Sequence, residues 1–480
     1  MLKQTAPLQP RFADYSMPQA VTGSPTSSNS KFALFALFCI YSRVLELLSI
    51  FLGRTIPYLL SVIFVVVFLL AVFNGRIMSF VKTNTAYRYF VLFTLWLFPC
   101  ILFGFWPGGS VHLLLYVWLP VMVGISGIGA SVYSWNQQRQ VTWLMAMSSL
   151  TIALFSIMFG DFDGTGRLQI RGGTLGNSND MALLVLVGFP FLCFHALDKL
   201  SSSFKKTVAL IGIPFMVLAV LRTGSRAGLL TLLVSFLLLL LFSHGANRIK
   251  LVMLAALMVL VATTFVSNMV LKRLATLFEA EAGSEATAST NQRSIKLLES
   301  VEMTLTHPLF GVGPGVHEAA QAKEDEKAGI RPDWLVSHNT MTQISQETGV
   351  PGFALYTFAI FGSFLQLWAV RRALFRIDSL RNHRDLLSAF LISGISIFIL
   401  NLFGANGYLP YTPLLFVLMS NVTTLAQNDI VAAQQQHLAH AFPGSGRQSP
   451  KTSARPAFNR PLAKPGYILK PGAPFKGISR

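Results

Sequence analysis

The sequence predicts an all-α protein, built as a polytopic bundle of transmembrane helices. Of its 480 residues, 52% are hydrophobic and only 12% are charged, against about 25% charged residues in soluble domains, and the mean hydropathy is +0.55. The apolar residues form long runs that short polar breaks separate. Runs of this kind predict membrane-spanning helices, because the strands of a membrane β-barrel alternate and give a much weaker signal.

Twelve apolar runs are interpreted as helices. Their approximate centres are residues 42, 65, 98, 121, 151, 189, 214, 236, 260, 360, 395 and 419. Between the ninth and tenth runs lies one long polar insertion, residues 272–348. An unpaired charge within the hydrocarbon costs several kcal/mol, so acid–base chemistry is expected in this insertion and in the other loops of the same side.

The distribution of charge predicts the topology. With a cytoplasmic N-terminus, 25 of the 38 Lys and Arg residues fall on the inner side, as the positive-inside rule requires. Fourteen of the 20 acidic residues fall on the outer side, and 11 of these lie in the insertion. The net charge of +18 is therefore a topology signal, and no nucleic-acid partner is predicted.

Composition divides the chain into three parts. Residues 1–31, rich in Pro, Ser, Thr and Gln, are expected to form a disordered cytoplasmic tail. Residues 32–427 form the transmembrane domain. Residues 428–480, which are basic and rich in proline after residue 440, are expected to be a disordered cytoplasmic tail that is attracted to anionic membrane lipids.

Two features that suggest ligand-binding motifs are interpreted as structural. The turn Gly311–Gly315 has the glycines of a phosphate loop, but Pro314 removes a backbone donor and no strand precedes it. All three cysteines lie inside apolar runs without a metal or disulfide pattern, so we expect them to serve in packing: Cys39, Cys100 and Cys193. No metal site is predicted.

The turn between the seventh and eighth runs predicts an anion site at the outer interface. It reads Arg222-Thr-Gly-Ser225-Arg226-Ala-Gly. Glycine lets the backbone approach a ligand, and guanidinium groups bind phosphate through two hydrogen bonds, so Arg222, Ser225 and Arg226 are candidates for contact with an anionic headgroup. The alternative is that both arginines only reach toward lipid phosphates.

Residues 291–306 are predicted to form an amphipathic helix that ends at His307-Pro308. Spacing at 100° per residue places Arg293, Lys296, Ser300 and Thr304 on one face, and Ile295, Leu298, Val301 and Leu305 on another. Arg293 and Lys296 are candidate site residues on the polar face. The alternative is a surface helix whose charges only face water.

Residues 339–348 are predicted to form one short helix, capped by Asn339 or Ser337 and stopped by Gly349 and Pro351. His338 then lies at the positive end of the helix dipole. This position favours the neutral imidazole that a general base needs near pH 7.

Glu347 lies nine residues after His338. A helical rise of about 1.5 Å per residue separates the two side chains by roughly 13 Å, which excludes a direct His–Glu dyad. We expect Glu347 to anchor the return of the insertion into the membrane by pairing with an arginine.

The outer loop 161–180 holds two further candidates, Arg171 and Asn177, in a glycine-rich turn that also suits a helix N-cap. In the first run, Arg43 and Glu46 are three residues apart and are expected to pair on one helical face as a buried structural pair.

The order of these motifs resembles the superfamily of O-antigen ligases and O-antigen polymerases. The similar segments are Thr223–Arg226, the helix with Arg293, Gly311–Gly315, His338-Asn339 and Glu347–Gly349. The Gly176–Asp180 turn is similar to the family's Gly-Asn-x-Asn turn, except that Asp180 stands where an apolar or aromatic residue is expected.

The resemblance implies transfer of a glycan from a polyprenyl diphosphate carrier to a glycan or lipid acceptor hydroxyl, at the outer face of the bacterial inner membrane, without metal, nucleotide or other cofactor. In these terms Arg226 and Arg293 stabilise the diphosphate. His338 activates the acceptor, and substrate contacts come from Ser225, Arg222, Lys296, Asn339, Arg171 and Asn177.

Two alternatives remain open from the sequence. A transporter or flippase of a lipid-linked glycan would also suit twelve helices, although it predicts charged residues in the spans and repeated halves. A glycosyltransferase that uses a polyprenyl monophosphate sugar would need a carboxylate near residues 53–55, and none is there. Within the superfamily the sequence does not separate ligase from polymerase.

Overall fold

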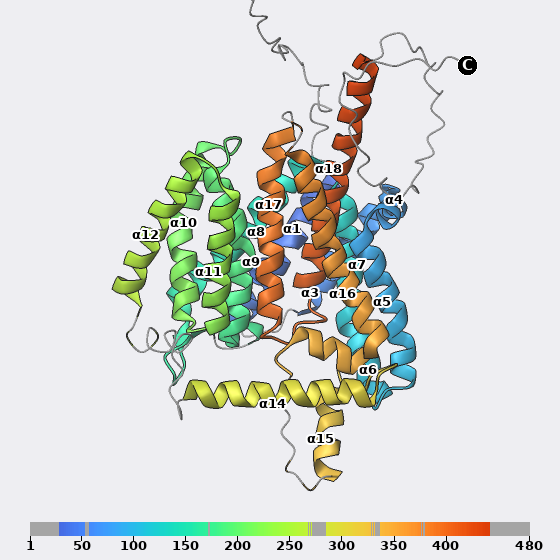
Figure 1. Cartoon of the computed structure of the whole chain (residues 1–480). Helices are drawn as coiled ribbons and strands as arrows, with labels where there is room; N and C mark the ends of the chain where they lie inside the picture. The colour runs from blue at the N-terminus through green and yellow to red at the C-terminus, as the bar shows by residue number, and fades with distance from the viewer. Residues whose placement is uncertain are drawn as a thin grey trace, which may run out of the picture. The chain divides into compact units, whose positions relative to one another are not determined.

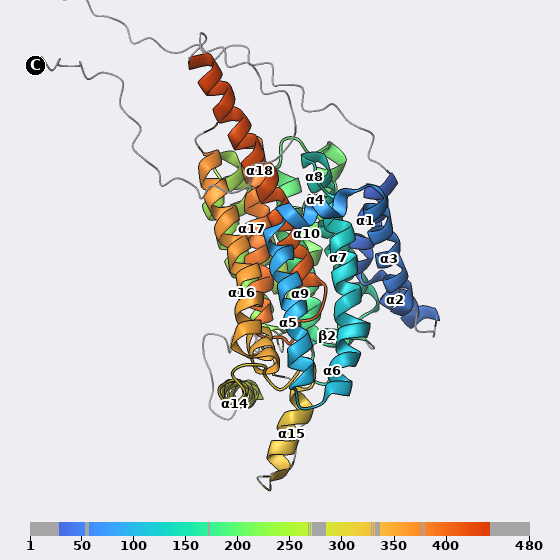
Figure 2. The same ribbon diagram turned by 90° about the vertical axis from the view of Figure 1, so that its right-hand side faces the viewer.

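The structure, a computed structural model, describes residues 28–52, 57–170, 173–266, 285–327, 337–375 and 380–441, together with isolated positions between these ranges. The chain divides into two compact units, residues 1–431 and 432–480. In the first unit, apolar helices stand side by side in a bundle, and α14 runs crosswise to them at one end (Figures 1 and 2).

Helices make up nearly all of the described chain. In order they are α1 (Ser28–Ser42), α2 (Val44–Leu52), α3 (Pro57–Phe73), α4 (Arg76–Thr83), α5 (Thr85–Leu102), α6 (Pro107–Leu113), the π-helix Leu114–Trp118, α7 (Leu119–Ser131), α8 (Trp135–Phe159), α9 (Ser178–Leu197), α10 (Ser203–Arg222), α11 (Arg226–Phe242), α12 (Ala246–Phe265), α14 (Glu285–Thr306), α15 (His317–Lys327), α16 (Thr340–Leu374), α17 (Arg381–Asn401) and α18 (Tyr411–Ala441). A small antiparallel hairpin joins β1 (Asp161–Phe162) to β2 (Leu168–Gln169).

The predicted all-α membrane bundle is confirmed, but twelve full spans are not. Among the described residues, nine helices are long and apolar enough to cross a membrane, or ten if α3 and α4, bent by 97°, form one span. The first and eighth predicted runs instead give the shorter apolar helices Ser30–Ser42 and α11. Both fall below the roughly 20 residues that a perpendicular span needs. The protein is a multi-pass membrane protein.

Two elements depart from the predicted boundaries. The α1 helix ends at Ser42 because Arg43 has a left-handed backbone, with φ 52°, and α2 follows. Arg43 and Glu46 do pair, but across this break rather than on one helical face. At the other end, α18 continues past residue 427 to Ala441. The rest of both predicted tails, and residues 53–55, lie outside the described residues.

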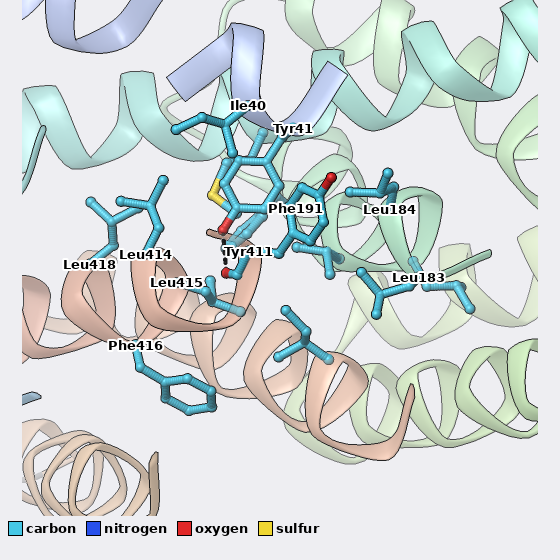
Figure 3. Close-up of a cluster of buried hydrophobic side chains, with 14 of the residues drawn as sticks. Ile40, Tyr41, Leu183, Leu184, Phe191, Tyr411, Leu414, Leu415, Phe416 and Leu418 are labelled. Atoms are coloured by element: carbon cyan, nitrogen blue, oxygen red, sulfur yellow. Dashed lines mark hydrogen bonds between the residues drawn. The ribbon is translucent and has the colours of Figure 1, made fainter. Parts of the chain in front are cut away.

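The core is centred on α9, whose residues 181–195 are all buried. A helix that is apolar on every side fits only inside a bundle, and α9 packs against α8, α10, α11 and α17. Figure 3 shows side chains of α1, α9 and α18 meeting in this core. The Tyr41 hydroxyl donates to the Tyr411 carbonyl at 2.8 Å, which satisfies the phenol within the apolar interior.

Loops predicted on the outer side converge at one end of the bundle. The Arg167 Nε donates to the Thr223 carbonyl at 3.0 Å, joining the loop before β2 to the end of α10. The Asn406 N–H donates to the Thr340 hydroxyl at 3.0 Å, joining the loop after α17 to the start of α16. The α14 helix lies at this same end and α4 at the opposite one (Figure 1). We call the first end the site end.

The predicted short helix 339–348 is confirmed as the first part of α16. The Asn339 side chain caps it by accepting from the N–H groups of Met341 (2.8 Å) and Thr342 (3.3 Å). Gly349, with φ 67° and ψ −177°, ends it, and a second helical part continues to Leu374. The cap is Asn339 and not Ser337, whose hydroxyl donates to the Asn339 carbonyl.

Replacing Gly349 by alanine is expected to destabilise the protein by several kcal/mol. A backbone with φ 67° and ψ −177° is adopted almost only by glycine, and it costs an L-residue about 1–3 kcal/mol. The added Cβ would also overlap the Leu309 carbonyl and lie 2.7 Å from the Pro308 oxygen, neither of which is a flexible side-chain end. The measurement is thermal unfolding in detergent.

Gly362 of the same helix is the control, because its Cβ would meet nothing within 4 Å. Gly362→Ala should be neutral or slightly stabilising, and equal effects of the two changes would contradict this account of the kink.

Candidate functional site

A small polar pocket of about 40 Å³ lies at the site end. Its lining comes from four separate parts of the chain: Arg167 before β2, Asn179 in the first turn of α9, Gly224–Ala227 at the start of α11, and Arg293 of α14. Three arginines therefore border one pocket. Guanidinium groups in this number favour a polyvalent anion such as a diphosphate.

The start of α11 adds backbone donors to this pocket. Ser225 is the N-cap, since its hydroxyl accepts from the Gly228 N–H at 3.0 Å and donates to the Asn179 side chain at 2.8 Å. Gly224 turns the chain into this helix with a left-handed φ of 57°. The positive end of the helix dipole thus lies at the pocket, where it stabilises negative charge.

Arg167 also lines the pocket, although it was not among the candidates predicted from the sequence. In addition to its bond with Thr223, its Nη2 donates to the Asn179 Oδ1 at 3.2 Å, so the guanidinium is held at the pocket wall. Of the two candidates predicted in this loop, Asn177 is not among the described residues that line the pocket. Asn177 caps α9 by accepting from the Asn179 N–H at 2.9 Å, and Arg171 lies outside the described residues.

Arg222 and Arg226 have different surroundings, although both flank the same turn. Arg226 lines the pocket. The guanidinium of Arg222 donates from Nε and Nη2 to the Phe265 carbonyl of α12, at 3.3 and 3.2 Å, and Arg222 is not among the pocket residues. Only one of the two predicted arginines thus borders the site.

The α14 helix presents its polar face to the protein. It begins at Glu285, before the predicted start at 291, and ends at Thr306 as predicted. Lys296 is 5% exposed and its Nζ contacts the Glu299 carboxylate at 2.8 Å. Thr304 shares a hydrogen bond of 2.9 Å with Ser345 of α16. The interpretation that the charges of this helix only face water is therefore wrong.

His338 lies directly before the cap of α16, partly buried, with a left-handed φ of 49° that is uncommon for a residue other than glycine. Burial lowers its pKa below 6.5, and the positive charge of Arg293 lowers it further. The neutral form is therefore favoured near pH 7. The predicted direction is correct, while the causes are burial and Arg293.

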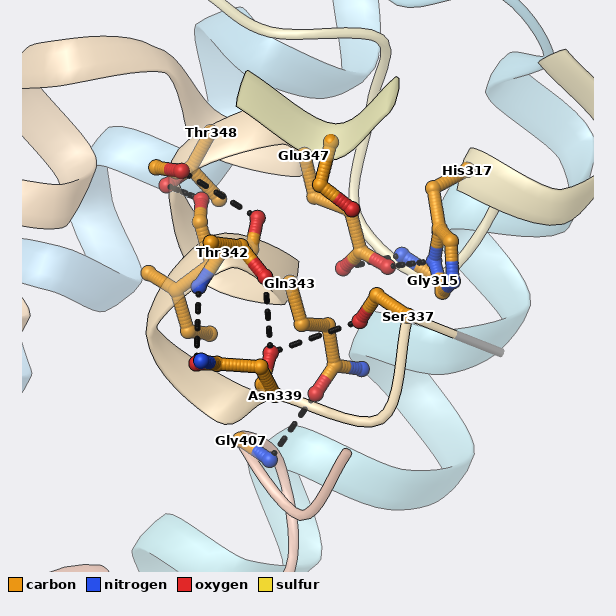
Figure 4. Close-up of polar contacts among 12 residues, drawn as sticks. Gly315, His317, Ser337, Asn339, Thr342, Gln343, Glu347, Thr348 and Gly407 are labelled. Carbon is orange, nitrogen blue, oxygen red and sulfur yellow. Dashed lines mark hydrogen bonds and ion pairs between the residues drawn. The ribbon is translucent and has the colours of Figure 1, made fainter. Parts of the chain in front are cut away.

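Glu347 anchors a turn, but its partner is a histidine and not an arginine. This side chain is fully buried, accepts from the Gly315 N–H at 2.8 Å and pairs with Nδ1 of His317 (Figure 4). The turn also donates from Val312 to the Gln346 carbonyl at 2.9 Å and from Gly313 to the Glu347 carbonyl at 3.1 Å. The Gly311–Gly315 turn is therefore structural, as predicted, and it is fastened to α16.

His317 was not selected from the sequence. Burial alone would lower its pKa, but the hydrogen bond and the charge of Glu347 outweigh burial and raise the pKa above 6.5. In the sequence, the only indication of this His317–Glu347 pair is that a histidine stands two residues after the glycine turn. Nothing local connects it to a glutamate 30 positions away.

Replacing Glu347 by glutamine is expected to destabilise the protein by about 3–5 kcal/mol, because it leaves the buried His317 without its charged partner. The raised pKa of His317 fixes the sign of the pH dependence: the contribution is fully present below pH 6.5 and is lost as pH rises through the folded-state pKa. The difference in melting temperature between wild type and variant should therefore shrink from pH 6 to alkaline pH.

The control for this pair is Glu324→Gln, which removes the partner of Lys327 from an ion pair that is exposed on both sides. It should leave the melting temperature nearly unchanged and show no such trend between pH 6 and alkaline pH. A difference for Glu347→Gln that stays constant with pH would show that protonated His317 does not supply the stability.

The cysteines have the predicted structural role: all three are free and buried. Within the ranges that the structure describes, no group of three or more His, Cys, Asp or Glu side chains is placed to hold a metal ion.

Comparison with known proteins bears on the region that builds this pocket. Residues 211–357 match a family model described as O-antigen ligase. The matched segment runs from within α10 to within α16 and contains Arg226, Arg293, His338 and Glu347, whereas Arg167 and Asn179 precede it. The family consists of glycan-processing membrane enzymes. No curated protein matches the chain.

Proposed function

We propose that this protein transfers an oligosaccharide or polysaccharide from a polyprenyl diphosphate carrier to an acceptor hydroxyl. The observation that carries the proposal is the pocket in which Arg167, Arg226 and Arg293 surround the N-terminus of α11. As the bond between the anomeric carbon and the carrier breaks, negative charge grows on the departing diphosphate. Fixed guanidinium groups and helix N–H donors stabilise that charge more strongly in the transition state than in the ground state.

His338 supplies the second half of the reaction. With its pKa lowered, the imidazole accepts the proton of the acceptor hydroxyl as the oxygen attacks the anomeric carbon. The new glycosidic bond forms while the bond to the diphosphate breaks, the proton passes to His338, and the carrier leaves as polyprenyl diphosphate. Attack opposite to the leaving group inverts the anomeric carbon.

The remaining candidates support these groups. Ser225, Asn177 and Asn339 are N-caps that fix the starts of α11, α9 and α16, where the pocket and His338 lie. Lys296 adds positive charge on the inward face of α14, and Arg171 remains a proposed substrate contact. Arg222 stays outside the proposed site because its guanidinium is directed to α12.

We propose that the site end lies at the outer face of a bacterial inner membrane, because α14 and α15 of the acidic insertion lie at this end and α4, with its basic residues, lies at the other end (Figure 1). A polyprenyl-linked glycan presented on that face reaches the pocket from the surrounding lipid. The acceptor is a lipid-linked core or another glycan. Surface glycan in a deletion strain distinguishes the two: loss of chain length indicates a polymerase, and accumulation of unattached long chains indicates a ligase.

The decisive test uses the purified chain in nanodiscs with a polyprenyl-diphosphate oligosaccharide and an acceptor glycan. We expect release of one polyprenyl diphosphate for each glycosidic bond formed, with inversion at the transferred sugar. A donor that remains chemically intact, while the protein moves it between the leaflets of a vesicle, would establish the transporter instead.

A further inference from the structure

The α14 helix turns its apolar face away from the protein. The exposed fractions of Ile295, Leu298, Val301 and Leu305 are 56%, 69%, 43% and 73%. On the opposite side, Lys296 and Ser300 are 5% and 3% exposed. Surface helices of water-soluble domains have the reverse arrangement, because their apolar side faces the core. A row of exposed apolar side chains along a helix therefore indicates that another molecule covers this face.

The position of α14 indicates what this partner is. After its last turn the chain reaches Phe310, whose ring stacks on Phe103 at 4.7 Å and on Trp96 at 5.6 Å between centroids. Both rings belong to the end of α5 and its following turn, and α5 is a candidate membrane span. Phe103 and Trp106 in this turn are 68% and 55% exposed.

Tryptophan and tyrosine side chains are enriched where a span leaves the hydrocarbon and enters the headgroup layer, and Trp96 and Trp106 stand at this end of α5. The stacking of Phe310 therefore ties the C-terminal end of α14 to the depth of the membrane interface. Figures 1 and 2 show the helix lengthwise and end-on, crosswise to the spans at their ends. An amphipathic helix in this position lies in the plane of the membrane surface, with its apolar side about 5–10 Å into the boundary of headgroups and acyl chains.

We propose that α14 is an interfacial helix, and that the lipids of the leaflet at the site end cover its face of Ile295, Leu298, Val301 and Leu305. This inference goes beyond the transfer reaction and does not depend on it. The two faces of α14 then have different roles. The apolar face holds the helix at a fixed depth in the lipid, and Arg293 on the polar face lines the pocket at that depth. A diphosphate carried by a membrane lipid lies in the same layer.

Nitroxide labels test this directly on the full chain in nanodiscs. Cysteine is introduced at one position at a time, as Leu298→Cys, Leu305→Cys and, for the control, Glu324→Cys on α15, where the side chain is 58% exposed. The native cysteines are buried, so the label attaches to the new one. The measurement is the ratio of nitroxide relaxation by oxygen, which concentrates in lipid, to relaxation by a water-soluble nickel chelate.

We expect oxygen to relax the labels at positions 298 and 305 several-fold more, relative to nickel, than it relaxes the label at 324. Ratios equal to that of Glu324→Cys would place the face in water and overturn the proposal. Shielding from both reagents would also overturn it, because a protein surface would then cover α14. If that shielding comes with spin–spin broadening in nanodiscs that hold two chains and not in those that hold one, the covering surface is a second copy.

Discussion

Replacing Arg226 by alanine is expected to lower glycan transfer by about 100- to 1000-fold, the range for loss of one fixed donor to a developing negative charge. Arg226 lies in the first turn of α11, where the helix N-terminus and the guanidinium act on the same pocket. Lysine at this position should recover only part of the rate. It retains the charge, but it loses the planar pair of donors that binds a phosphate through two hydrogen bonds.

Arg222→Ala is the matched control, because it removes an arginine from the other side of the same turn while leaving the pocket lining intact. Its activity should stay within a few-fold of wild type. Both variants should insert in the membrane and give the same gel-filtration profile. Full activity of Arg226→Ala in a folded protein would remove the basis of the proposed site, and equal losses in both variants would point to the fold of the turn.

Much of the fold followed from local chemistry. The long apolar runs predicted helices. Asn339 and Gly349 marked the limits of the first part of α16, because a helix cap and a turn with positive φ depend on only a few neighbouring residues. The arginine turn before α11 was found for the same reason. Arg43 shows where such reasoning ends, since the sequence around it is that of a continuous helix and the break appears only in the structure.

The composition of the pocket did not follow from the sequence alone, because it depends on contacts between distant segments. Arg167 is held by Thr223 and Asn179, which are 56 and 12 positions away. The partner of Glu347 is 30 positions away. For α14, periodicity divided the two faces correctly. It did not show which face turned inward, because the apolar face of a helix in a membrane protein can be covered either by the protein core or by lipid.

Replacing His338 by alanine is expected to lower the rate by about 100- to 10,000-fold, the usual contribution of a general base. Thermal unfolding should change little by comparison, because Asn339 and not His338 caps α16. The measurement is single-turnover transfer with saturating donor. A variant that keeps the wild-type rate would show that another group takes the acceptor proton.

The pH profile gives the stronger test, because two features of the structure fix its direction. Burial and the charge of Arg293 hold the pKa of His338 below 6.5, so the imidazole is neutral at pH 7. We therefore expect kcat/KM to fall only at more acidic pH, where the imidazole gains a proton. Arg293→Gln removes the positive charge, so the pKa of His338 should rise and the acid limb of its residual activity should move toward neutral pH. Arg226→Lys keeps its charge and should leave the limb where it is in the wild type. An acid limb that does not move in Arg293→Gln would mean that the titrating group lies away from Arg293, and His338 would then not be the base.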